Sequence, residues 1–80
     1  MSKHREEQDM LDKTILEILS KGKLRRKDIE KKVLASCHPW ATYGRFCNRF
    51  RYLLKKEYIV RIARGIYAIT ETGRKYMELL

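Results

Sequence analysis

Hydrophobic positions recur at helical spacing in the first part of the chain. Over residues 9–20 they form one stripe, made of Leu11, Ile15, Ile18 and Leu19. This stripe predicts a helix with Asp9 as its N-cap and Gly22 just beyond its end. Residues 22–25 predict a short extended connector, and residues 26–36 predict a second helix buried through Ile29 and Val33. Pro39 ends that helix, because the residue before a proline disfavours the helical conformation.

A third helix is predicted over residues 42–57, with Thr42 as its N-cap. Its buried stripe consists of Phe46, Phe50, Leu53 and Leu54. At about 100° per residue, the positions turned away from that stripe are Gly44, Asn48, Arg51, Tyr52 and Lys55, flanked by Arg45, Arg49 and Lys56. The predicted outward face therefore carries hydrogen-bonding and stacking side chains and no acid.

Residues 58–70 change to β-branched and aromatic side chains around Arg64-Gly65, which is typical of a β-hairpin. A two-residue turn at this point pairs the strands from Ala63–Ile66 to Val60–Ile69. Alternation of side chains then predicts one apolar and aromatic face, made of Val60, Ile62, Tyr67 and Ile69. Thr70 is expected to cap a short helix that closes the chain.

The length and composition favour one small domain. The chain has 80 residues, of which 44% are hydrophobic, enough for a single packed core. We expect a flexible N-terminal tail over residues 1–8 and one domain over residues 9–80, of the α+β class and mostly α. No apolar run is long enough to span a membrane, and the charged N-terminus argues against a secretory signal, so a cytoplasmic location is expected.

The net charge is +9, and the middle of the chain carries the excess. Residues 21–32 hold seven lysines and arginines against two acids, and residues 41–68 hold seven against one. Residues 1–20 are slightly acidic. This distribution predicts one basic face directed at a polyanion. A solvated, lysine-rich surface is the alternative explanation.

Other chemistry has little support in the sequence. Cys37, His38 and Cys47 offer three zinc ligands without a standard spacing, so no metal or other cofactor is expected. A disulfide between the two cysteines, or between subunits, requires an organism that tolerates intracellular disulfides. No nucleophile–base pair, paired acids or glycine-rich phosphate loop is found, which argues against an enzyme.

The predicted order of elements resembles a winged helix-turn-helix: a three-helix core, a two-stranded hairpin wing and a C-terminal helix. The stretch from Leu53 to Gly73 is similar to MarR-like and PadR-like regulators, through Tyr58, Ile59, Tyr67, Ile69, Thr70 and Gly73. The small size and arginine-rich helix also resemble single-domain winged-helix proteins of archaea and their viruses. Glu57 departs from the pattern, since a glycine is usual there.

The resemblance implies that the third helix enters the DNA major groove while the wing touches the backbone or minor groove. Position along that helix places four residues nearest the base edges: Tyr43, Arg45, Asn48 and Arg49. Phosphate contacts are expected further along, from Arg51, Tyr52, Lys55 and Lys56. Further phosphate or wing contacts are expected from Thr42, Arg25, Arg26, Lys27, Arg61 and Arg64.

The expected function is a double-stranded DNA-binding transcription regulator. Apolar residues left over from the core predict a homodimer through Met10, Leu16, Met77, Leu79 and Leu80. A protein-interaction module of a larger assembly and an RNA or single-strand binder remain open as alternatives. DNA binding requires that the arginines of residues 42–57 protrude, rather than pack against neighbouring carboxylates.

Overall fold

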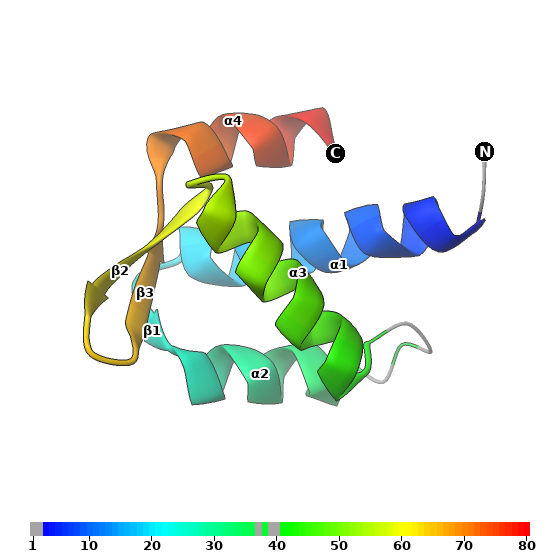
Figure 1. Ribbon diagram of the computed structural model, residues 1–80, viewed down its shortest axis with the longest axis horizontal. Helices are drawn as coiled ribbons and strands as arrows, with labels where there is room; N and C mark the ends of the chain where they lie inside the picture. Colours follow the sequence, from blue (N-terminus) through cyan, green and yellow to red (C-terminus); the bar gives the residue numbers. More distant parts are fainter. Residues whose placement is uncertain (1–2, 37, 39–40) are drawn as a thin grey trace.

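The computed structural model describes residues 3–36, 38 and 41–80, which form a small, mostly helical α+β fold (Figure 1). In this part of the chain four helices accompany a three-stranded antiparallel sheet. The elements in chain order are α1 (Lys3–Ser20), β1 (Leu24–Arg25), α2 (Arg26–Ala35), α3 (Tyr43–Lys55), β2 (Ile59–Ala63), β3 (Ile66–Ile69) and α4 (Glu71–Leu79).

The first helix is longer than the sequence pattern predicts. It begins at Lys3, so residues 3–8 continue the helix, and Asp9 lies inside it rather than at its N-cap. These polar residues carry no hydrophobic stripe of their own. Glu7 instead forms an ion pair with Arg45 of α3, which supports the early turns from a neighbouring helix.

The sheet contains one strand more than the predicted hairpin. Its strand order is β1-β3-β2, because Leu24 pairs with Tyr67 and Arg25 with Ile66. The segment predicted as an extended connector is thus the third strand, and it ties the start of α2 to the hairpin. Among the described residues, β1 pairs with one edge of the hairpin, and the other edge, that of β2, has no partner strand.

The hairpin turn lies at Arg64-Gly65 as predicted, and Ala63 faces Ile66. Beyond that pair the predicted register is wrong, since the ladder shifts between Arg61 and Ala63. Such a bulge inserts one extra residue into one strand and moves every later pair by one position. The observed pairs are Arg61–Tyr67, Val60–Ala68 and Ile59–Ile69. Consequently Ile59 is buried in the core, whereas Val60 and Ile62 are exposed.

The core lies between α1, α2 and α3 and extends onto the sheet. Phe46, Phe50 and Leu53 of α3 are buried as predicted, and the Phe50 ring meets Tyr67 of β3 edge-on, with 4.8 Å between the ring centroids. Leu16 is also completely buried. The prediction that Leu16 lines a dimer interface is therefore wrong, because this side chain belongs to the core of the monomer.

The start of α4 is fixed by two residues of the predicted Thr-x-x-Gly sequence. The Thr70 hydroxyl accepts a hydrogen bond from the Gly73 amide at 3.0 Å, which confirms the predicted cap. A Cβ at Gly73 would lie 1.9 Å from the carbonyl oxygen of Tyr58. Only glycine therefore allows α4 to pack this closely against the segment between α3 and β2.

Candidate nucleic-acid interface

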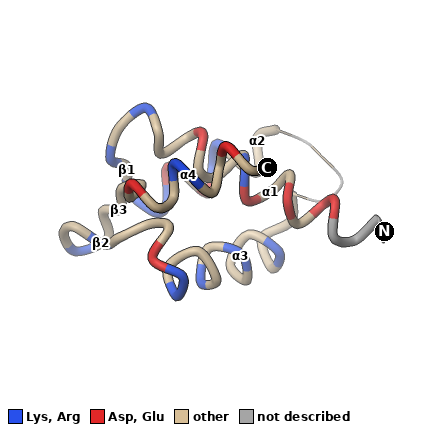
Figure 2. Tube along the Cα trace, turned by 90° about the horizontal axis from the view of Figure 1, so that it is seen from above, with Lys and Arg blue, Asp and Glu red and all other residues tan. Residues whose placement is uncertain are grey.

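Helix α3 lies along one edge of the molecule, with lysines and arginines on it (Figure 2). Its N-terminus is capped by Thr42, whose hydroxyl accepts a hydrogen bond from the Arg45 amide at 3.3 Å. At its C-terminus the Tyr58 amide donates to the Leu53 carbonyl, and the Glu57 amide to the Leu54 carbonyl. This termination places Glu57 at φ 62°, a left-handed conformation that usually belongs to glycine.

An exposed ridge runs along α3, made of Gly44, Asn48, Arg51 and Lys55. These residues recur at helical spacing on the side away from Phe46, Phe50 and Leu53, as the sequence predicts. Within the described ranges, Arg51, Lys55 and the neighbouring Lys56 take part in no ion pair. The ridge therefore presents cations and one amide to solvent.

Arg49 does not belong to this ridge. Its Nε donates to Oδ1 of Asp12 at 2.7 Å, and its Nη2 donates to Oδ2 at 2.6 Å. The Asp12 side chain is 0% exposed and that of Arg49 is 16% exposed. The prediction that Arg49 reads base edges is contradicted by this placement, because the guanidinium satisfies a buried carboxylate on α1.

Burial and the ion pair set the ionisation of this cluster. Burial raises the pKa of Asp12 above its usual value, while the hydrogen bonds from Arg49 oppose that rise. The Asp12 carboxylate in turn raises the pKa of Arg49. The Tyr76 hydroxyl donates to Asp12 Oδ2 at 3.3 Å, and burial together with this carboxylate raises the pKa of Tyr76 to about 12.

Tyr52 is held beside the same cluster rather than turned outward. The Arg49 guanidinium lies over the Tyr52 ring, 4.2 Å from the centroid, and the Lys56 ammonium lies 6.0 Å from it. Tyr52 is half-buried and packs against the core. The Tyr52 ring thus packs under two cations, and its phosphate contact stays a prediction.

Arg45 is also held by a carboxylate of α1, that of Glu7. This pair differs from Asp12–Arg49 because the Arg45 side chain remains 43% exposed. Exposed ion pairs contribute little to stability and exchange readily with other anions. Arg45 can therefore leave Glu7 for a phosphate, whereas Arg49 cannot leave Asp12 without leaving a buried carboxylate unpaired.

A second basic surface lies beside α3. A cleft of about 540 Å³ separates the hairpin turn from the start of α2 and is lined by Arg25, Arg26, Lys27, Glu30, Tyr43, Arg64, Gly65 and Ile66. Four cations and one carboxylate, that of Glu30, line this cleft. Tyr43 is 60% exposed at its edge. The structure thus brings together residues that sequence reasoning had assigned to three separate segments.

Arg26 is anchored at this cleft. Its Nη2 donates to the Cys47 sulfur at 3.2 Å, and its guanidinium lies 5.5 Å from the centroid of the Phe50 ring. Arg61 is placed differently, since it lies on β2 outside the cleft and its Nε donates to the Ala63 carbonyl at 3.4 Å. Arg25, Arg26, Lys27 and Arg64 therefore form one group, and Arg61 is separate from it.

The residues that sequence reasoning missed are acids. Glu7 and Asp12 select which arginines of α3 remain free, and Glu30 lines the basic cleft. Asp12 offered a signal, because it falls on the same helical stripe as Ile15, Leu16 and Leu19. A carboxylate on a buried stripe requires a cationic or hydrogen-bonding partner.

The zinc and disulfide hypotheses involve Cys37, which lies outside the described residues, as do Pro39 and Trp40. Among residues 3–36, 38 and 41–80 no group of three metal-ligating side chains is found. In the same part of the chain, none of the helices has the length and apolar character that crossing a membrane requires.

No protein-family model, curated protein or solved structure matches this chain.

Proposed function

We propose that this chain is a winged helix-turn-helix protein that binds double-stranded DNA and acts as a transcription regulator. The element order α1-β1-α2-α3-β2-β3-α4 and the strand order β1-β3-β2 support this assignment. In this proposal α2 and α3 are the helix-turn-helix and the β2–β3 hairpin is the wing. The additional strand β1 joins the wing to the start of α2.

The observation that carries the proposal is the exposed ridge of α3. Asn48, Arg51 and Lys55 lie one helical turn apart, and no acid occurs between Tyr43 and Lys56. A helix fits the major groove, where arginine pairs with guanine and asparagine with adenine. In this docking Asn48 and Arg51 face base edges, and Lys55 meets phosphate. These assignments replace Arg49, which its ion pair with Asp12 holds away from the ridge. Of the three arginines of residues 42–57, Arg45 and Arg49 pair with carboxylates of α1, so the requirement for protruding arginines is met by Arg51 alone.

The basic cleft supplies the backbone contacts. Arg25, Arg26 and Lys27 lie on one side of it and Arg64 on the other. The sugar–phosphate backbone of a DNA strand that passes the N-terminal end of α3 would therefore meet cations from both sides. Such contacts carry no sequence information but fix the register of the protein on the duplex. They also make affinity strongly dependent on salt, because each neutralised phosphate releases counterions.

The proposed homodimer would use four of the five apolar side chains expected from the sequence, without the buried Leu16. Met10 and Leu79 are exposed apolar side chains, 51% and 84% accessible, on α1 and α4. Met77 and Leu80 are half-buried against the core and contribute only partial surface. A dimer through these helices would present two copies of α3 to successive turns of the duplex.

The proposal is tested by fluorescence anisotropy with a labelled duplex of about two helical turns, the matching single strand, and an RNA hairpin. We expect the duplex to bind most tightly, with about a thousandfold loss of affinity between 50 and 200 mM salt. The double variant R51Q/K55Q should weaken duplex binding at least tenfold. The matched control K21Q/K32Q removes two charges elsewhere and should weaken it much less.

Two results would contradict the proposal. Tighter binding to the single strand or to RNA would favour the stacking role of the exposed Tyr43. Equal, weak binding to all three nucleic acids would favour a protein-interaction module.

A further inference from the structure

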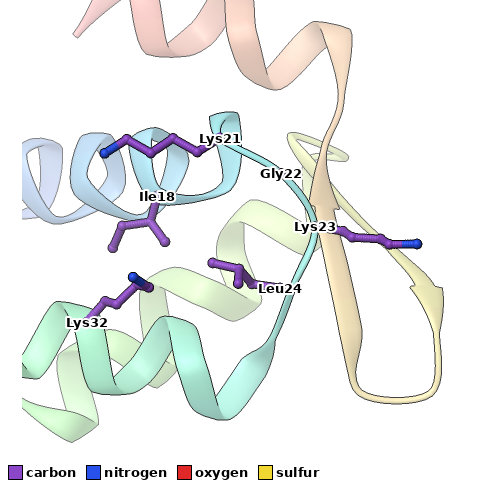
Figure 3. Close-up of a pocket in the computed structure, with 6 residues that line it drawn as sticks. All are labelled: Ile18, Lys21, Gly22, Lys23, Leu24 and Lys32. Atoms are coloured by element: carbon purple, nitrogen blue, oxygen red, sulfur yellow. The ribbon is translucent and has the colours of Figure 1, made fainter.

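A further cationic feature, separate from the ridge and from the basic cleft, lies away from α3. It is a pocket of about 210 Å³ between the end of α1, the connection to β1, and α2, shown in Figure 3. Ile18 and Leu24 form its apolar floor, and Lys21, Lys23 and Lys32 also line it. Lys32 projects toward Ile18, Lys21 runs back along α1, and Lys23 points away toward the hairpin side.

The lysines of this pocket have no acidic partner. In the part of the chain that the structure describes, none of the three forms an ion pair, although Glu17 and Asp28 lie four residues from Lys21 and Lys32. Like charges around an apolar depression repel one another, and the nearby low-dielectric surface weakens their screening. An anion that also carries an apolar group would relieve this repulsion and cover the floor.

The pocket and the ridge of α3 lie on opposite sides of the molecule. Figure 1 has α3 in front of α1 and α2, and Figure 3, drawn with the hairpin on the other side, has α1 and α2 in front of α3. None of the residues that line this pocket lines the basic cleft beside Tyr43. A ligand here would leave the ridge of α3 free.

We propose that this pocket binds an acidic peptide segment of a partner protein, with one aliphatic or aromatic side chain on the Ile18–Leu24 floor and flanking carboxylates on Lys21 and Lys32. The apolar floor distinguishes this ligand from a second duplex, because a sugar–phosphate backbone has no group that gains from contact with it. The volume suits one side chain rather than a helix face. The proposal does not depend on duplex binding by α3.

The test uses the full chain and a fluorescein-labelled nonapeptide of aspartates and glutamates around one central leucine. We expect saturable binding that weakens about tenfold in K21Q/K32Q, since two exposed ion pairs are lost. The control R51Q/K55Q carries the same net charge and should bind the peptide like the wild type. A second peptide with serine in place of the leucine should bind about tenfold more weakly. We expect thermal melts to show that both variants remain folded, because all four substituted side chains are exposed.

Several results would overturn the inference. Equal binding to K21Q/K32Q and R51Q/K55Q would mean that only net charge matters. Equal binding of the leucine and serine peptides would mean that the Ile18–Leu24 floor does not contribute to binding. A short duplex is added as a competitor of the peptide for this pocket. If it displaces the peptide, and if K21Q/K32Q also weakens the binding of that duplex, the pocket is a phosphodiester site instead. Peptide binding that persists while duplex binding fails would contradict only the DNA proposal.

Discussion

Asp12 of α1 and Arg49 of α3 form a bidentate ion pair, with nitrogen–oxygen distances of 2.7 and 2.6 Å, and the Asp12 side chain has no solvent exposure. The pair joins the acidic first helix to the basic third helix. It fixes the rotation of α3, so that Asn48, Arg51 and Lys55 rather than Arg49 face solvent. Because the proposed interface depends on this rotation, the ion pair positions the interface without being part of it.

Replacing Arg49 should destabilise the fold. In R49M the Asp12 carboxylate remains buried without its partner, so we expect the free energy of unfolding to fall by about 3 kcal/mol. D12N should cost less, because Arg49 is 16% exposed and can turn its charge to water. Urea denaturation of both variants measures these changes. R51M serves as the matched control on the ridge, and its stability should change by less than about 0.5 kcal/mol. Equal stability of R49M and R51M would contradict the structural role of the pair.

Stability should also fall at alkaline pH because of Tyr76. The pKa of Tyr76 is raised from 10.0 to about 12 in the folded protein, so the folded state holds this proton more tightly than the unfolded chain. Stability from this group is complete below pH 10 and is lost as pH rises toward 12. Y76F should show a shallower decrease over this range, although it loses the hydrogen bond to Asp12 at all pH values. Parallel pH profiles of the two proteins would contradict the assignment.

Glu7 should restrain duplex binding through Arg45. In E7Q the exposed guanidinium of Arg45 loses its ion pair and becomes available to a phosphate. We expect three- to tenfold tighter duplex binding and one additional contact, seen as a slope of log affinity against log salt that is steeper by about 0.9. E6Q is the control, because it removes the same charge from an exposed neighbour in α1. Identical gains in E6Q and E7Q would show that only net charge changed.

Glu57 should be replaceable by glycine with a gain in stability. The residue adopts φ 62° at the end of α3, a conformation that costs a side-chain-bearing residue about 1–2 kcal/mol. Glycine removes this cost but loses more entropy on folding, so E57G should gain roughly 0.5–1 kcal/mol. E57Q keeps the Cβ and should show no such gain in thermal melts. A loss of stability in E57G would mean that the Glu57 side chain makes a contact that outweighs the strain.

Periodicity predicted the helices well because burial of an apolar stripe determines them. The cap at Thr42, the buried Phe46, Phe50 and Leu53, and the turn at Arg64-Gly65 are confirmed. The two-residue strand β1 and the bulge in β2 were not predictable in this way. Strand β1 forms only by pairing with β3, which is distant in sequence. The bulge shifts the pairing of β2 with β3 by one residue, and the alternation of side chains does not reveal such a shift.

The candidate site was predicted less completely than the fold. Helical geometry correctly placed Asn48, Arg51 and Lys55 outward, but it treated Arg45 and Arg49 as equally free. Whether each arginine is free depends on an acid of α1 that is far away in sequence. Glu7 precedes Arg45 by 38 residues, and Asp12 precedes Arg49 by 37. Local spacing contains no information about that contact.

The most direct test of the DNA proposal is a titration of the isotopically labelled protein with a short duplex, followed by amide and side-chain NMR. We predict the largest shifts at Asn48, Arg51 and Lys55, with smaller ones at Arg26 and Arg64. Lys21 and Lys32 on the opposite face should remain unchanged. Shifts confined to that opposite face, or none along α3, would contradict the account.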